Sequence, residues 1–175
     1  MPGLWYEDFT PGAVIEHAEA VPVTMEQNVA FCRLTRNEQP LHLDEAYART
    51  TPFGRVVVNG LLTFGLAVGV SVRDTTAGTL VANLGYQDVE HPEPVFPGDT
   101  LRFRTEVVDK RASSKPGRGV VTLRHTALNQ HGKEVCRFKR TVMVQTRPAG
   151  ALDAATGSHP AQGRPATGVQ PGERP

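Results

Sequence analysis

Cysteine is scarce in this chain, and its scarcity excludes several kinds of protein. Only two of the 175 residues are cysteines, Cys32 and Cys136. Two are too few for a disulfide framework or for a cysteine-based metal cluster. Cysteines used so sparingly are typical of a reducing compartment, where thiols act mostly as small buried hydrophobes. The sequence therefore favours a cytoplasmic protein.

Long hydrophobic runs and an excess of charge are also absent. The longest apolar stretch, residues 60–72, is shorter than the roughly 20 residues that a membrane span needs. The N-terminus has neither the basic region nor the apolar core of a secretory signal. Lys and Arg number 19 against 18 Asp and Glu, which gives a formal net charge of +1. We therefore expect a protein that binds neither membranes nor nucleic acid.

The composition changes sharply near Arg147. Residues 148–175 contain five Pro, five Gly and no aromatic residue, and their only larger apolar side chains are Leu152 and Val169. Such a segment buries too little surface to offset the entropy of ordering it. We therefore expect one folded domain over residues 3–147 and a disordered tail, rich in Pro, Gly and Ala, over residues 148–175.

Helix signals dominate the first half of the domain. Thr24 followed by Gln27 forms the pattern of a capping box, and Asp44 can cap a second, short helix. Asn59 opens a third helix, which is apolar on nearly every face and is therefore expected to be buried. The expected elements are one strand and three helices, over residues 14–23, 27–34, 45–48 and 60–73.

The second half of the domain changes to the periodicity of strands. Four segments rich in Val, Thr and Leu alternate in polarity, and Gly117 and the pair His131-Gly132 supply turns between them. These segments are residues 79–90, 100–112, 118–130 and 134–146. A buried helix followed by four long antiparallel strands is an α+β arrangement, in which a curved sheet wraps around the helix. This topology is the hot-dog fold.

Four groups of residues occur in the order and spacing of a known family. They are Tyr6–Gly12, Phe31–Ala48, Val58–Leu62 and Val95–Leu101. Together they resemble the MaoC-like hydratases, the (R)-specific enoyl-CoA hydratase group, over nearly all of residues 3–147. Residues 59–89 look most similar to the branch of mesaconyl-CoA hydratase (β-methylmalyl-CoA dehydratase). The resemblance implies a hydro-lyase that reversibly hydrates a short 2-enoyl-CoA thioester.

The most specific part of the resemblance is the loop from Arg36 to His42. The family pattern there is Gly-Asp-x-Asn-Pro-(Leu/Ile/Val)-His, and in the family its Asp and His hold the water that adds across the double bond. His42 matches the His by position, whereas Asn37 replaces the Asp. An amide neither accepts nor releases a proton at physiological pH, but it can orient a water by hydrogen bonds.

Hydration of a 2-enoyl thioester needs a base, an acid and a donor to the enolate oxygen. Histidine suits proton transfer near neutral pH, so His42 is the candidate base, with Asn37 orienting the water and Glu38 and Asp44 as substitute acids. The expected donor is the backbone N–H of Gly60, where the helix dipole favours negative charge. Each residue also has a purely structural interpretation, as a cap, a turn residue or a packing glycine.

Two further groups are expected to bind the substrate. The family has His-Gly where this chain has Asn59-Gly60, and we assign Asn59 to substrate binding. The densest positive stretch, residues 110–118, joins two strands. Its Arg111, Lys115 and Arg118 are candidates for contacts with the phosphates of coenzyme A. A solvated hairpin is the alternative interpretation of this stretch.

The remaining expectations concern partners, cofactors and rival functions. No cofactor and no metal are expected, because the protein polarises the substrate and the histidines show no metal-ligand spacing. The fold implies a homodimer or higher homo-oligomer, because pairing twin edge strands buries an otherwise open edge. One rival is a hot-dog thioesterase, although residues 60–73 contain no acid to activate water. Another is a catalytically silent acyl-CoA-binding protein, with Asn37 marking lost chemistry.

Overall fold

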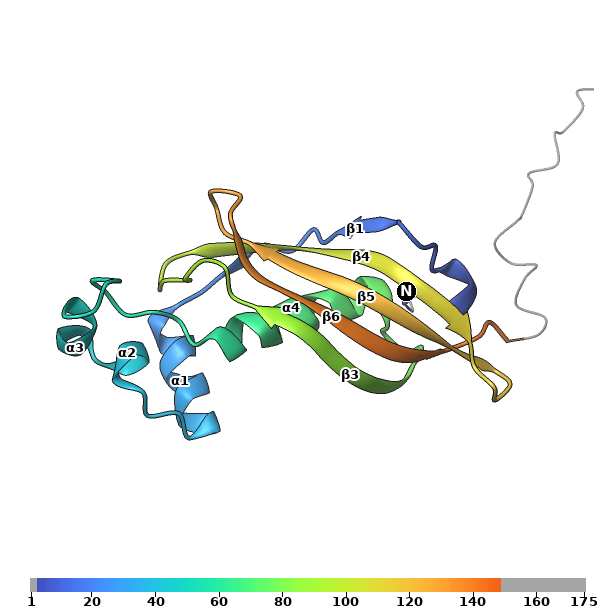
Figure 1. Cartoon of the computed structure of the whole chain (residues 1–175), viewed down its shortest axis with the longest axis horizontal. Helices are drawn as coiled ribbons and strands as arrows, with labels where there is room; N and C mark the ends of the chain where they lie inside the picture. The colour runs from blue at the N-terminus through green and yellow to red at the C-terminus, as the bar shows by residue number, and fades with distance from the viewer. Residues whose placement is uncertain (1–2, 149–175) are drawn as a thin grey trace, which may run out of the picture.

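One long helix lies along the inner face of an antiparallel sheet (Figure 1). The computed structural model describes residues 3–148. Its strands lie in the order β1-β4-β5-β6-β3, and β2 also pairs with β4. The strands are β1 (Val14–Glu16), β2 (Val21–Pro22), β3 (Leu80–Glu90), β4 (Thr100–Ala112), β5 (Arg118–Leu128) and β6 (Glu134–Gln145). The helices are a 3-10 turn η1 (Tyr6–Asp8), α1 (Met25–Thr35), α2 (Pro40–Leu43), α3 (Glu45–Arg49) and α4 (Gly60–Thr75).

This arrangement confirms the α+β, hot-dog prediction. Helix α4 runs beneath the four long strands, while α1, α2 and α3 gather at one end of the molecule (Figure 1). The capping box before α1 is also confirmed: the Gln27 N–H donates to Thr24 Oγ1 at 3.1 Å, and the Thr24 N–H donates to Gln27 Oε1 at 2.9 Å. Of the predicted tail, all but Pro148 lies outside the described residues.

Two elements differ from the sequence-based expectation. The single strand predicted over residues 14–23 is two short strands, because β1 pairs with the middle of β4 and β2 pairs with its start. Between them the chain turns the side chain of His17 inward, where it is buried. The loop expected over residues 35–43 contains the short helix α2, which begins at Pro40; proline is favoured in the first turn of a helix.

Apolar packing fixes α4 against the sheet. The ring of Phe64, one turn into the helix, lies 4.4 Å from that of Phe138 on β6 and 4.8 Å from that of Tyr86 on β3, measured between centroids. Phe103 and Phe138 belong to one buried cluster with Ala67 of the helix. Aromatic contacts of this kind contribute beyond simple area burial, so the N-terminal half of α4 is held firmly in place.

A chain of polar side chains crosses the core near the C-terminal half of α4. Asp74 Oδ2 lies 2.7 Å from His17 Nδ1, and His17 Nε2 lies 2.8 Å from Thr105 Oγ1. The same hydroxyl lies 2.9 Å from Nδ1 of His125, whose Nε2 has no partner among the described residues. The buried Arg140 lies nearby and donates from Nε to Asn83. A buried polar network of this kind ties together elements distant in sequence.

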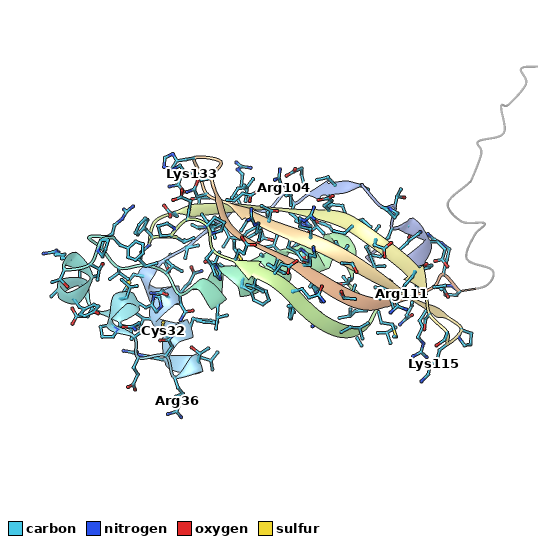
Figure 2. The ribbon with its side chains drawn as sticks, in the orientation of Figure 1. Cys32, Arg36, Arg104, Arg111, Lys115 and Lys133 are labelled. Atoms are coloured by element: carbon cyan, nitrogen blue, oxygen red, sulfur yellow. The ribbon has the colours of Figure 1, made fainter. Side chains whose placement is uncertain are left out.

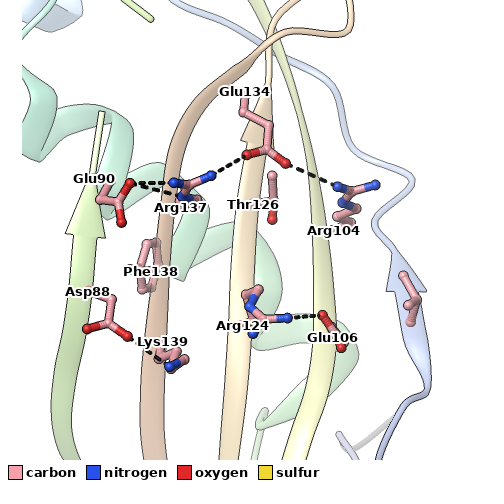
Figure 3. A pocket seen from close by; sticks show the side chains of 11 residues that line it. Asp88, Glu90, Arg104, Glu106, Arg124, Thr126, Glu134, Arg137, Phe138 and Lys139 are labelled. Carbon is pink, nitrogen blue, oxygen red and sulfur yellow. Dashed lines mark hydrogen bonds and ion pairs between the residues drawn. The ribbon is translucent and has the colours of Figure 1, made fainter. Parts of the chain in front are cut away.

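The outer face of the sheet carries a lattice of ion pairs around a hollow of about 690 Å³ (Figure 3). Four basic and four acidic side chains line it and form ion pairs between strands, three of them between neighbouring strands and one, Arg104–Glu134, from β4 to β6 across β5. The pairs are Arg104–Glu134, Arg124–Glu106, Arg137–Glu90 and Lys139–Asp88. Because the charges cancel and exposed pairs contribute little each, this hollow does not favour a ligand of either charge.

The two ends of the described chain are joined to each other. Arg147 donates from its backbone N–H to Glu7 Oε2 at 2.9 Å and from its guanidinium to Asp8 Oδ1. The backbone N–H of Gly3 donates to Ala77 O, just beyond α4. We call the contacts between Arg147 and residues 7–8 the terminal clasp. The start and the end of the folded unit therefore lie side by side.

Candidate functional site

A cleft of about 370 Å³ opens at the N-terminal end of α4. Side chains come from α2, from the segment before α4, from α4 itself and from the segment after β3. The lining residues are His42, Phe53, Val57, Val58, Gly60, Thr63 and residues 91–95. Its walls are mainly apolar, and its titratable side chains are those of His42, His91 and Glu93. Apolar walls with a few converging polar groups are typical of ligand sites.

His42 is held on both sides. Its Nδ1 lies 2.7 Å from the carbonyl oxygen of Val57. A carbonyl oxygen only accepts hydrogen bonds, so Nδ1 carries the proton and Nε2 of the neutral ring keeps a free lone pair. The backbone oxygen of His42 accepts a hydrogen bond of 2.8 Å from Asn28 Nδ2. The structure thus gives His42 the fixed orientation and the basic nitrogen that a proton acceptor needs.

Asn28 connects the three helices that build this site, and sequence reasoning missed it. Its side chain is fully buried; Nδ2 donates to His42 O in α2, and Oδ1 accepts the N–H of Asn59 at 2.9 Å. An unpaired amide would be costly to bury, so Asn28 fixes α2 relative to the start of α4. The available signal was an asparagine four residues before Cys32, on the same face of α1.

Asn59 has a structural task in this arrangement. It is 3% exposed and is not among the residues that line the cleft. Its Oδ1 accepts the N–H of Leu61 at 3.0 Å, which makes it the N-cap of α4. Its Nδ2 lies 3.6 Å from Cys32 Sγ. Asn59 therefore positions the helix terminus, and the contact with substrate that was expected of it stays a prediction.

Gly60 brings a free backbone donor to the cleft. It is the first residue of the 16-residue helix α4, and its N–H makes no hydrogen bond to another described residue. Such a group, at the positive end of a helix dipole, stabilises a developing negative charge. One turn later Thr63 lines the same cleft, and its buried hydroxyl also has no partner among residues 3–148. Thr63 was not singled out from the sequence.

Asn37 lies in the loop between α1 and α2 and is not a lining residue of the cleft. Its Oδ1 accepts the N–H of Gln39 at 3.0 Å. This local bond is the asparagine turn that commonly starts a loop. Within this loop the amide oxygen therefore shapes the approach to Pro40. The acids weighed as substitutes, Glu38 and Asp44, are exposed, and Asp44 Oδ1 accepts the N–H of Tyr47 as the cap of α3.

The basic hairpin lies at the far end of the molecule from the cleft. Arg111 and Lys115 are at one end in Figure 2, whereas Cys32 and Arg36 mark the helical end. Arg118, the first residue of β5, pairs with Gln145 at the hairpin end of the sheet. Within one chain, these three cations therefore do not meet the cleft.

His91 also lies in the cleft, and the sequence alone assigned it no role. A β-carbon added to Gly60 would lie 3.0 Å from Cε1 and Nε2 of the His91 ring. The imidazole therefore covers Gly60 directly. Nothing local in the sequence points to this contact, because β3 separates the two residues.

Residues 3–148 contain neither a metal-binding cluster nor a membrane-spanning helix. No three His, Cys, Asp or Glu side chains gather in a way that could hold a metal ion. None of the helices in this part of the chain has the length and apolar character to cross a membrane.

Comparison with known proteins places this cleft in a family. Residues 8–129 match the family model of the MaoC like domain. The chain is 34% identical to the mesaconyl-CoA hydratase of Cereibacter sphaeroides over 85% of this chain and 43% of that protein. It is 36% identical to the (R)-specific enoyl-CoA hydratase of Aeromonas caviae over 59% of this chain and 72% of that protein.

A solved structure from Mycobacterium tuberculosis, a protein with a double hot-dog fold, superposes with a TM-score of 0.76 at 28% identity. The match covers 97% of this chain and 53% of that one. The chain also spans less than half the length of the curated mesaconyl-CoA hydratases that it matches. Because the family model matches residues 8–129, the chain belongs to the MaoC-like domain family.

Proposed function

We propose that this protein catalyses the reversible addition of water to the double bond of a short 2-enoyl-CoA, with a mesaconyl-CoA-like acyl group. The observation that carries the proposal is one cleft shared by the free Nε2 of His42 and the free N–H of Gly60. Those are the base and the oxyanion donor that hydration of an enoyl thioester requires. Relatives named for hydration of CoA thioesters support the same reaction.

In the proposed mechanism the thioester oxygen accepts the Gly60 N–H. Nε2 of His42 takes a proton from water, and the resulting hydroxide adds to Cβ of the substrate. The double-bond electrons move to the thioester as an enolate, whose oxygen is stabilised by Gly60 and the dipole of α4. Protonation of Cα completes the reaction. Asn37 is proposed to orient the water through its Nδ2, as the family loop does with its carboxylate; this role requires its side chain to turn toward the cleft, which it does not line here.

The direct test offers crotonyl-CoA and mesaconyl-CoA to the purified full-length protein. Loss of the enoyl-thioester absorbance without free thiol supports hydration. Release of free thiol instead supports a thioesterase, for which Glu93 in the cleft is the candidate acid, although it lies 3.8 Å from Lys133 as an ion pair. Binding of both thioesters with neither change supports a catalytically silent acyl-CoA-binding protein and overturns the proposal.

Variants at the two proposed groups test the assignment. We expect His42→Ala to lower kcat/KM for hydration by about 10²–10⁴-fold, the usual contribution of general acid–base catalysis. His131→Ala, at an exposed turn that does not line the cleft, is the matched control and should leave the rate unchanged. An active His42→Ala enzyme would assign the base elsewhere.

Gly60→Ala tests the donor. Its β-carbon meets the His91 ring at 3.0 Å, whereas a β-carbon at Gly65, in the same helix, meets nothing within 4 Å. We expect Gly60→Ala to lower kcat/KM by about 10²-fold, the loss expected when one oxyanion donor is displaced. Gly65→Ala should leave kcat/KM near the parent value. Equal rates for the two variants contradict the role of Gly60.

We further propose that the protein is a homodimer joined through β3. This strand is an edge of the sheet, and it exposes a row of large apolar side chains: Leu80, Val81, Leu84, Tyr86 and Val89. Edge strands of this kind are templates for pairing with another strand. Leu84→Lys should produce monomers in sedimentation experiments. Val14→Lys, at an exposed valine on the opposite edge strand, should stay dimeric.

Such a dimer would give the basic hairpin a role. In the sheet, Leu80 at the start of β3 pairs with Val144, which pairs with Gly119 beside the hairpin, and β3 ends next to His91. Two β3 strands paired antiparallel about a two-fold axis would bring the hairpin of each chain toward the cleft of its partner. We propose that Arg111, Lys115 and Arg118 contact the phosphates of coenzyme A there.

A truncated substrate tests the hairpin. Lys115→Ala and Arg111→Ala should raise KM for the CoA thioester several-fold, and should leave KM for the matching pantetheine thioester, which lacks the nucleotide phosphates, unchanged. Lys139→Ala, which removes an outer-face charge paired with Asp88, is the control. Equal effects on both substrates rule out the phosphate contact.

We also propose that the protein works in a reducing compartment such as the cytoplasm. Both cysteines are free and buried, and burial raises the pKa of the Cys136 thiol to about 11. Such thiols pack as small apolar groups. Unchanged stability with and without a thiol reductant is the expected result.

A further inference from the structure

Hydration moves two protons at two different atoms, and the family-like loop supplies a group for only one of them. A base must take a proton from water, and an acid must give a proton to Cα. In the loop from Arg36 to His42, the residue in the carboxylate position is Asn37, whose oxygen is already bonded to Gln39 N–H. An amide cannot act as an acid or a base at physiological pH. The second proton therefore needs another source.

His91 is placed to supply it. Two of its ring atoms, Nε2 among them, lie 3.0 Å from the position of a β-carbon on Gly60. A thioester oxygen that accepts the Gly60 N–H would lie about 2.9 Å from the backbone nitrogen of Gly60. The substrate Cα is only ~2.4 Å from its own thioester oxygen, by standard bond lengths. The His91 ring and Cα are thus brought to the same end of α4.

The other titratable groups of the cleft are less suited to this step. Nδ1 of His42 is bonded to Val57 O, so its one free nitrogen is occupied by the water. The carboxylate of Glu93 is engaged in an ion pair with Lys133 at 3.8 Å. The His91 ring makes no hydrogen bond or ion pair with another described residue, so both of its nitrogens are available to a substrate.

The segment that carries His91 is well fixed and open to solvent. Pro92 and Pro94 restrict the backbone beside it, and Val58 N–H donates to Val95 O at 2.8 Å, which ties the segment to the start of α4. His91 itself is exposed. An imidazole fixed at a cleft wall and in contact with bulk water can recover its proton between turnovers.

We propose that His91 is a second catalytic residue, the acid that protonates Cα, and this inference rests on the proposed hydration. As hydroxide adds to Cβ, the double-bond electrons move into the enolate. The enolate then forms a Cα–H bond with the proton of a His91 ring N–H, and that N–H electron pair stays on the nitrogen. The proton held by His42 leaves to solvent, and His91 takes one up, so one water is added overall. In dehydration the neutral His91 removes the Cα proton.

The test compares His91→Gln with the parent protein on crotonyl-CoA. We expect kcat/KM to fall by about 10²–10³-fold, within the range of general acid catalysis, while the affinity for butyryl-CoA, which has no double bond to hydrate, changes less than threefold. His131→Gln is the matched control and should keep the parent rate. The alkaline limb of the kcat/KM profile should be lost in His91→Gln, because protonated His91 is no longer needed.

Hydration in D₂O separates proton delivery from a merely structural role. The parent enzyme should place deuterium at one of the two Cα positions of the product, as seen by NMR. The small residual product of His91→Gln should be a mixture of molecules with their single deuterium at one position or the other, because solvent then delivers it from either side. Added imidazole should partly restore the rate of His91→Ala.

The outcomes keep the two proposals apart. A parent protein that hydrates no enoyl-CoA overturns the proposed function and this inference with it. A parent protein that is active, with His91→Gln retaining its rate, its alkaline limb and its single-sided deuteration, overturns the role of His91 alone. Loss of butyryl-CoA affinity equal to the loss of rate also overturns it, because His91 would then only shape the cleft.

Discussion

Mild acid should destabilise this protein through one buried imidazole. His125 is 1% exposed, stacks against Phe138 with 4.9 Å between ring centroids and is bonded through Nδ1 to Thr105. Burial, reinforced by the charge of Arg140 and by His17, lowers the pKa of His125 from 6.5 to about 3. The folded protein therefore keeps this ring neutral over most of the acid range.

The sign and size of the effect follow from linkage. In the unfolded chain His125 takes up a proton as the pH falls through 6.5, whereas the folded protein does not until about pH 3. The stability that depends on the neutral ring is complete above pH 6.5 and is lost progressively between pH 6.5 and 3. Each pH unit well inside that window costs ~1.4 kcal/mol. Between pH 7 and 5 the expected loss from this residue is about 2 kcal/mol.

Urea unfolding at several pH values between 7 and 5 measures this loss. His125→Phe is the comparison, because it keeps an aromatic ring against Phe138 and leaves Thr105 its bond to His17. The variant is expected to have a different stability at pH 7 but a flatter dependence on pH, by about 1 kcal/mol per unit near pH 5. Parallel curves for the two proteins would refute the reasoning and assign the pH dependence to other groups.

Three further predictions concern packing and chain ends. Gly119→Ala should lower the free energy of unfolding by about 1–3 kcal/mol, because its β-carbon would overlap the ring of Tyr6. A Tm of the variant above that of the parent protein would contradict this. Asn28→Ala should cost about 1–3 kcal/mol by leaving buried groups of His42 and Asn59 unpaired, and should also slow hydration; a stable and fully active variant argues against it. Removal of residues 149–175, which carry no aromatic side chain, should change Tm by about 1 °C or less in calorimetry, and a large drop would show that the segment docks.

Features that depend on neighbours in sequence could be predicted. The pairing of Thr24 with Gln27 and the apolar character of α4 are local patterns, and each gave its element within a few residues. The resemblance of the loop at His42 pointed to the cleft, although the bonds that orient this histidine come from Val57 and Asn28, 15 and 14 residues away. The α+β, hot-dog expectation also followed from the order of such elements.

The features of the site that could not be predicted from the sequence depend on contacts between segments that are distant along the chain. Asn28 and Asn59 are 31 residues apart, and their bond exists only because α1 packs against the start of α4. His91 reaches Gly60 only because β3 returns along the helix that precedes it. The role of Asn37 could not be predicted for another reason. Its side-chain oxygen accepts a short-range hydrogen bond from the Gln39 N–H, and the family pattern does not indicate this bond.

The terminal clasp has a consequence for how this unit can be combined with others in a gene. Arg147 is bonded to residues 7 and 8, so the chain enters and leaves the folded unit at one place. Residues 3 and 148 could then be joined by a short peptide and the chain reopened in the turn at His131-Gly132, a circular permutation that keeps every strand intact. For the same reason the whole unit could be inserted as a cassette into a surface loop of a host protein without stretching that loop.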